Sequence, residues 1–286
     1  MNRESVRVAS TFRWTFALSV ILAAALTVSA PGQEDPAAAL VAGAGRYVEE
    51  YERQFSAVVG EVHEAQRVVK ADGIVRKQRA LVADVLLVKA GDVTRSFRDV
   101  ISVDGKPVRN RDERLRKLFL SESRSFNQQA RAISEESSRY DIGVKRGMDA
   151  LMLPLGILRS DRASGFRFVR TPDGLAFTEF RSPAMVRSRS RGATKDMFLR
   201  GNFTIDAVGS RVRSATLIAA DDIFELTEDI VYGEDRVTRL LVPLRSTETY
   251  RQTGNPKGDR TVVTSTFANF RKFQVTVDEQ LALPTP

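Results

Sequence analysis

Residues 79–108, RALVADVLLVKAGDVTRSFRDVISVDGKPV, predict a pair of neighbouring antiparallel strands. Two runs rich in Val, Leu and Ile, residues 79–89 and 94–103, have the composition and length of strands. Asp104-Gly105 after the second run predicts a tight turn, because glycine adopts a positive φ without steric cost. The first run is apolar at nearly every position. We therefore expect a strand that is covered on both faces.

The sequence before this hairpin changes its period near residue 57. Residues 36–56 place apolar side chains at steps of three and four, which predicts an amphipathic helix. From residue 57 the period is two. Val58 and Val62 alternate with Glu61 and His63, which is typical of a strand with one solvated face.

Residues 110–140 predict one long helix, which Asn110 and Glu113 would cap as a pair. Its apolar stripe consists of Leu115, Leu118, Phe119, Phe126, Ala130 and Ile133. A second, shorter helix is predicted over residues 148–158, with Pro154 bending or ending it.

The sequence after residue 165 predicts a long series of antiparallel strands. Residues 166–170 and 175–182 flank a turn at Thr171-Pro172-Asp173-Gly174. Further strands are predicted over residues 197–206, 211–219, 223–232, 236–244, 246–252 and 261–277, whereas residues 187–196 are expected to lack regular structure.

These elements indicate an α+β fold that is mainly β. About ten strands in one antiparallel sheet do not stay flat. We expect a strongly curved sheet, an incomplete β-barrel, with an N-terminal helix and two inserted helices covering its open side. Residues 33–286 would form this single domain.

The first 32 residues predict a cleaved secretory signal. Arg3, Arg7 and Arg13 precede the uncharged run TFALSVILAAALTVSA, residues 15–30, which is short for a membrane span. Cleavage is expected after Gly32; the alternative is an uncleaved anchor. The chain contains no cysteine, which excludes disulfides, thiolate nucleophiles and a lipidated N-terminal cysteine. We expect a periplasmic or secreted protein with no stable membrane span after cleavage and no nucleic-acid partner.

The formal net charge is +8, and a basic secreted protein favours anionic partners. In residues 181–195, Arg187, Arg189 and Arg191 occupy alternate positions, so an extended strand would place all three guanidinium groups on one side. Such a row suits a phosphate or carboxylate group, as on an anionic headgroup or an acidic partner. The alternative interpretation is a solvated loop.

Catalytic and metal-binding motifs are absent from the sequence. His63 is the only histidine, and strand alternation puts Glu61 on its side and Glu64 on the other. One imidazole and one carboxylate do not make a metal site. The acidic residues 221–229 lack the spacing of a calcium loop and predict a hairpin end. We predict no enzyme activity, metal or cofactor; a hydrolase with an unrecognised site around His63 is the remaining catalytic alternative.

Four stretches carry a resemblance to a known family: VVGEVHEAQRV (58–68) with the helix before it, GNFTIDAVGSRV (201–212), VPLRSTETY (242–250) and STFANFRKFQV (265–275). Their order resembles the LolA-like periplasmic lipoprotein carriers and their outer-membrane lipoprotein-sorting relatives. The resemblance implies an incomplete β-barrel with helices in its open side and an apolar cavity for lipid or lipoprotein acyl chains. The long 110–140 helix departs from the family and would reshape that cavity.

The first hypothesis is therefore a non-enzymatic binding or carrier protein with an apolar cavity. Its candidate lining residues are Leu86, Phe97, Ile101, Leu115, Phe119, Phe126 and Phe267. The alternative is an interaction or structural protein of the envelope with a filled core. It would use the Arg-rich residues 181–195 or the 110–140 helix as its contact surface.

Overall fold

The computed structural model describes residues 36–90, 93–119, 125–146, 151–190, 193–206, 208–253, 255 and 257–272. The predicted signal lies outside these residues, as does Arg191. The side chains of Phe126 and Arg189 are also outside the description.

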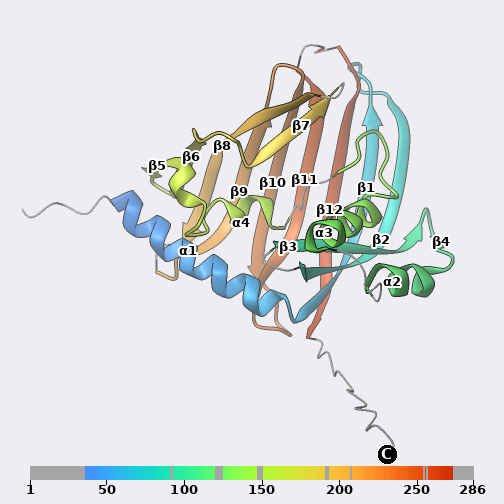
Figure 1. The fold of residues 1–286 in the computed structure, drawn as a ribbon, viewed down its shortest axis with the longest axis horizontal. Helices are drawn as coiled ribbons and strands as arrows, with labels where there is room; N and C mark the ends of the chain where they lie inside the picture. The colour runs from blue at the N-terminus through green and yellow to red at the C-terminus, as the bar shows by residue number, and fades with distance from the viewer. Residues whose placement is uncertain are drawn as a thin grey trace, which may run out of the picture. The chain divides into compact units, whose positions relative to one another are not determined.

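Twelve strands among the described residues form one antiparallel sheet with two open edges (Figure 1). The order is β4-β3-β2-β1-β12-β11-β10-β9-β8-β6-β5, and β7 pairs with β8 outside this path. The strands are β1 Val58–Val69, β2 Val75–Ala90, β3 Val93–Val103, β4 Lys106–Pro107, β5 Phe166–Thr171, β6 Gly174–Glu179, β7 Val186–Ser190, β8 Ala193–Asp206, β9 Arg211–Ala220, β10 Phe224–Glu234, β11 Leu241–Gln252 and β12 Arg260–Lys272. The predicted class, mainly β with an open antiparallel sheet, is confirmed, with two strands more than expected.

The turn between β3 and β4 has the predicted geometry. Asp104 and Gly105 both have positive φ, 48° and 75°. The Asp104 carboxylate also accepts a hydrogen bond from the backbone N–H of Ala80 at 2.8 Å, which ties the turn to β2. These two residues thus fix the hairpin that begins the sheet at its β4 edge.

Helix α1, Pro36–Phe55, confirms the first predicted helix and covers one face of the sheet. Its buried side includes Ala44, Val48, Tyr51 and Phe55. Figure 1 shows α4 on the same side of the sheet as α1, and both helices contribute to the main core. Gly45 permits a close approach, because a Cβ there would lie 2.7 Å from the carbonyl oxygen of Leu158.

The prediction of one helix over residues 110–140 is wrong. The structure has two, α2 Arg111–Phe119 and α3 Phe126–Ser137. Ser125 caps α3 in a capping box with Gln128. Asn110 has a φ of 54°, outside the extended conformation of an N-cap residue, so the predicted capping pair is also wrong.

Three further predictions are corrected. Helix α4 is only Leu153–Gly156, and Pro154 stands at its start, where a missing N–H is tolerated. Residues 187–196 are expected from the sequence to lack structure, but residues 187–190 pair with residues 193–196 in the β7–β8 hairpin. The sequence predicts two strands between residues 236 and 252, but the structure has the single strand β11 there. Residues 236–240 precede this strand, because the Asp235 carboxylate accepts hydrogen bonds from the N–H groups of Val237 and Thr238 in a turn.

Candidate functional site

The two faces of β2 pack against different hydrophobic clusters. Val85 and Leu87 belong to the main core, whereas Leu86 and Val88 pack against a second cluster beside α2 and α3. The centre of the second cluster is Phe97, which is 1% exposed, together with Leu118, Ala130 and Ile133. This arrangement explains why the sequence of β2 is apolar on both faces.

Four of the seven predicted cavity residues meet at this second cluster. Leu86 and Leu115 pack against it, and the Phe97 ring contacts the Phe119 ring edge-on, with 5.3 Å between centroids. Phe119 is 40% exposed. Phe267 instead packs against the main core from β12, and Ile101 is half-buried on β3. None of these residues lines either of the two pockets described next.

An apolar pocket lies between α1 and β5, with a volume of about 640 Å³. Its apolar lining comes from α1 (Ala37, Ala38, Val41, Ala42 and Gly45), from β5 (Phe166 and Phe168), and from Leu158 and Ala163 between α4 and β5. The two phenylalanines alternate along β5, and the Phe166 and Phe168 ring centroids are 6.2 Å apart. This pocket offers an apolar space of the size that holds small ligands.

Polar side chains stand around the apolar pocket. Arg46, Glu49, Ser160 and Arg167 contribute to its lining. Glu49 is engaged, because it accepts a hydrogen bond of 2.6 Å from the Ser160 hydroxyl. Arg46 and Arg167 are exposed. The pocket thus combines an apolar interior with exposed positive charge.

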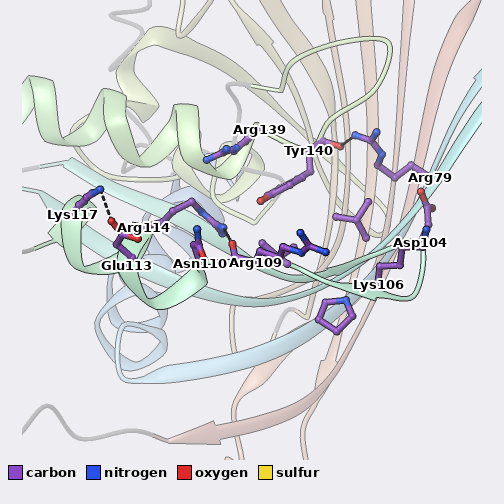
Figure 2. A pocket seen from close by; sticks show the side chains of 13 residues that line it. Arg79, Asp104, Lys106, Arg109, Asn110, Glu113, Arg114, Lys117, Arg139 and Tyr140 are labelled. Carbon is purple, nitrogen blue, oxygen red and sulfur yellow. Dashed lines mark hydrogen bonds and ion pairs between the residues drawn. The ribbon is translucent and has the colours of Figure 1, made fainter.

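A second, larger pocket of about 1230 Å³ lies between β4, α2 and the end of α3, and is called the basic pocket below (Figure 2). Six of its lining residues are cationic and two are carboxylates. The cations are Arg79, Lys106, Arg109, Arg114, Lys117 and Arg139, and the carboxylates are Asp104 and Glu113. This lining overlaps residues 110–140, which the sequence offers as a contact surface, but no sequence signal indicates the pocket itself.

Five charged side chains, Glu64, Arg98, Asp141, Arg146 and Glu248, form a buried ion network that joins β1, β3 and β11 to the segment after α3. Arg98 binds Glu64 at 2.7 Å and Asp141 at 2.8 Å. Arg146 binds both of these carboxylates at 2.7 Å and Glu248 at 3.1 Å. The side chains of Glu64 and Asp141 are only 3% and 1% exposed.

Neutral groups complete the buried ion network. Gln66 donates to Glu64 at 2.5 Å and to Asp141 at 3.2 Å. The Tyr250 hydroxyl donates to Glu248. Arg98 also holds the end of α3, because its backbone N–H donates to the Ser137 hydroxyl at 2.7 Å and its guanidinium to the Ser137 carbonyl. The network therefore ties α3 to the edge of β3 that β4 leaves uncovered.

The network has more carboxylates than guanidinium groups, and its pKa values reflect this. Burial raises the pKa of Glu248 to about 7; the hydrogen bond from Tyr250 opposes this shift and the charge of Glu64 adds to it. Burial also raises the pKa of Asp141 to about 6, against the lowering effect of Arg98. Burial lowers the pKa of Arg98, but Glu64 and Asp141 raise it more, so the guanidinium stays charged. Two buried guanidinium groups thus face three carboxylates, one of which takes up a proton near neutral pH.

The Arg-rich residues form part of a hairpin rather than a loop. Arg187 is exposed on β7. The hairpin is fixed to the turn before β10, because Ser188 donates to Asp221 at 2.5 Å and Lys195 pairs with Asp222 at 2.7 Å. Since Arg191 and the side chain of Arg189 lie outside the described residues, the row of three guanidinium groups stays a prediction.

His63 is exposed on β1 and contacts Glu61 at 2.5 Å, as strand alternation predicts, while Glu64 is buried on the other face. Asp221 caps a turn by accepting from the N–H groups of Ile223 and Phe224, so the acidic residues 221–229 begin a hairpin end. No group of three or more His, Asp or Glu among the described residues has the arrangement of a metal site. None of the described helices is long and apolar enough to cross a membrane.

Comparison with solved structures gives matches that cover most of this chain. One is an outer membrane lipoprotein-sorting protein domain from Vibrio parahaemolyticus, with 11% identity, a TM-score of 0.31, and coverage of 83% of this chain and 95% of that one. Another is a DUF1329 family protein from Desulfovibrio piger, with 10% identity, a TM-score of 0.27, and coverage of 87% and 95%. The first has the family description that the sequence resemblance indicated. No family model matches the chain, and no curated protein matches it. The function proposed below therefore rests on this chain's own residues.

Proposed function

We propose that this protein is a non-enzymatic binding protein of the cell envelope, periplasmic or secreted, that carries an acyl chain in the apolar pocket between α1 and β5. The observation that supports the proposal is the apolar part of this lining, to which α1 contributes five small or aliphatic residues and β5 contributes two phenylalanines. Its volume of about 640 Å³ is in the range of pockets that hold small ligands.

An acyl chain fits this lining because transfer of methylene groups from water is favourable. Each buried methylene contributes about 0.8 kcal/mol. A chain with about ten methylene groups in the pocket would gain roughly 8 kcal/mol before the entropy costs of binding. Arg46 and Arg167 are placed to bind a carboxylate or phosphate headgroup at the pocket mouth. The ligand class we propose is therefore a fatty acid or a lipid with one chain in the pocket.

The test is a fluorescent fatty acid, cis-parinaric acid, titrated without detergent into the protein purified after removal of the predicted signal. The only tryptophan is Trp14, in the predicted signal, so emission from the protein gives little background. We expect saturable binding that the variant Ala38→Phe weakens by roughly tenfold or more, because its ring fills space in the pocket.

Ala39→Phe is the matched control, since Ala39 is exposed on the same helix but does not line the pocket. It should bind the probe as the unchanged protein does. The proposal is wrong if the unchanged protein does not bind the probe, or if Ala38→Phe and Ala39→Phe bind it equally well.

A further inference from the structure

The basic pocket and the apolar pocket lie at opposite ends of the strand order. Strand β4 forms one edge of the sheet and β5 the other. The basic pocket is bounded by β4 and α2, whereas the apolar pocket is bounded by β5 and α1. A ligand in one pocket does not occupy the other, so the two sites can be tested separately.

The basic pocket has positive charge that its own carboxylates do not neutralise. The Asp104 carboxylate is used in the β3–β4 turn, where it accepts from the Ala80 N–H at 2.8 Å. Glu113 pairs with Lys117 at 2.7 Å. Within the described residues, no ion pair involves the side chains of Lys106 or Arg109, and both residues are exposed. These two cations are therefore available to a ligand.

Other cations of the basic pocket are held in place by the fold. Arg79 donates to the Tyr140 carbonyl at 2.7 Å. Arg114 donates to Glu136 at 2.9 Å and to the Arg109 carbonyl at 2.9 Å. The guanidinium carbons of Arg114 and Arg139 lie 5.9 and 5.8 Å from the centre of the Tyr140 ring, and Figure 2 shows this ring directed into the pocket. Such positioning lowers the side-chain entropy that the protein would lose when a ligand binds.

We propose that the basic pocket binds a small ligand with two or more phosphate groups. Guanidinium groups match phosphate oxygens because their planar N–H groups donate two parallel hydrogen bonds. One phosphate would not reach all the cations, which come from β2, β4, α2 and the end of α3 around a space of about 1230 Å³. Two or more phosphate groups occur together both on soluble phosphate esters and on some lipid headgroups.

The experiment measures how two phosphate-containing probes bind before and after two exposed cations of the basic pocket are replaced. Inorganic pyrophosphate is titrated by calorimetry, and vesicles with cardiolipin, whose headgroup carries two phosphate groups, are tested by co-sedimentation, both at low ionic strength. The variant is Lys106→Gln with Arg109→Gln. The control is Arg67→Gln with Lys77→Gln, which removes the same charge from exposed positions outside the pocket.

We expect the pocket variant to weaken binding of at least one probe roughly tenfold or more, and the control variant to keep most of it. Loss of pyrophosphate binding would support the site with a soluble ligand. Loss of vesicle binding alone would support it with a lipid headgroup. If neither probe binds, or if control and pocket variants weaken binding equally, the proposal is wrong. Binding of cis-parinaric acid should not change in the pocket variant, which separates this result from the fate of the acyl site.

Discussion

Replacement of Arg98 by methionine is expected to cost this protein a large part of its stability. Arg98 is the group that binds Glu64, Asp141 and the end of α3 at once. Methionine keeps an unbranched side chain of similar length but removes the charge and every side-chain hydrogen bond. Arg146 would then face the buried carboxylates alone.

The expected loss follows from the burial of those carboxylates. Glu64 and Asp141 are 3% and 1% exposed, so water does not replace the lost guanidinium. Removal of one partner from a buried ion pair costs about 3 to 5 kcal/mol, because it leaves the other charge uncompensated. Since the free energy of unfolding of a domain is about 5 to 15 kcal/mol, the variant would lose about a fifth of it or more.

Urea unfolding at neutral pH measures this loss, and the m-value shows whether the folded state is unchanged. The control is Arg131→Met, which removes an exposed pair with Glu135 on α3 and should change the free energy of unfolding by less than about 1 kcal/mol. The deficit of Arg98→Met should shrink as the pH falls, because protonation neutralises the stranded carboxylates. A deficit below about 1 kcal/mol at neutral pH would refute this account of the network.

Two further predictions concern the interior of the sheet. The pKa of Glu248 is raised from 4.5 to about 7, so the folded protein keeps a proton that the unfolded chain has released. The free energy of unfolding of the protein should therefore fall by about 1 to 3 kcal/mol as the pH rises from about 4.5 to 7. Urea titrations at several pH values should show that Glu248→Gln flattens this dependence. An unchanged slope in the variant would contradict the role given to Glu248. The buried hydroxyl of Tyr232 has no hydrogen-bond partner among the described residues, whereas that of Tyr250 donates to Glu248. Tyr232→Phe should thus raise the free energy of unfolding by about 1 kcal/mol, whereas Tyr250→Phe should lower it by about 1.5 to 3 kcal/mol. Equal changes in the two variants would show that the hydrogen bonding of these hydroxyl groups does not decide stability.

Local sequence signals were sufficient for the elements that a few neighbouring residues determine. The Asp104-Gly105 turn and the periodicity of α1 depend on interactions within one turn or one helix face. The division between α2 and α3 also had a local signal, the Ser125 and Gln128 pair of a capping box. The apolar residues from Leu115 to Ile133 predict one helix because α2 and α3 both contribute to the same cluster, so their apolar positions form one continuous pattern.

The buried ion network could be predicted only in part. Strand alternation puts Glu64 on the face of Val62 and therefore in the core. The partners of Glu64 are 34 and 82 residues away along the chain, at Arg98 and Arg146. No periodicity relates such positions, so the sequence shows a buried carboxylate but not what neutralises it.

The two pockets could not be predicted from the sequence for a different reason. The cavity residues predicted from the sequence are large and apolar, and large apolar side chains fill the space around them. Phe97 is the clearest example, since it lies at the centre of the second cluster. The apolar pocket is instead bounded by small residues such as Ala38 and Ala42, which leave space next to Phe166.

The open sheet itself explains why both proposed sites lie at its ends. Toward the middle of the strand order, the buried ion network occupies the face of β1 and β11, and α1 covers strands on either side of it. Strands β5 and β4 each pair on one side only within this sheet, and each lines one of the two pockets together with a helix. A helix beside a sheet edge leaves gaps that side chains fill incompletely, as α1 does beside β5 and α2 does beside β4. The two gaps differ in chemistry because their helices do: the start of α1 is built of alanine, glycine and valine, whereas α2 consists mainly of charged residues.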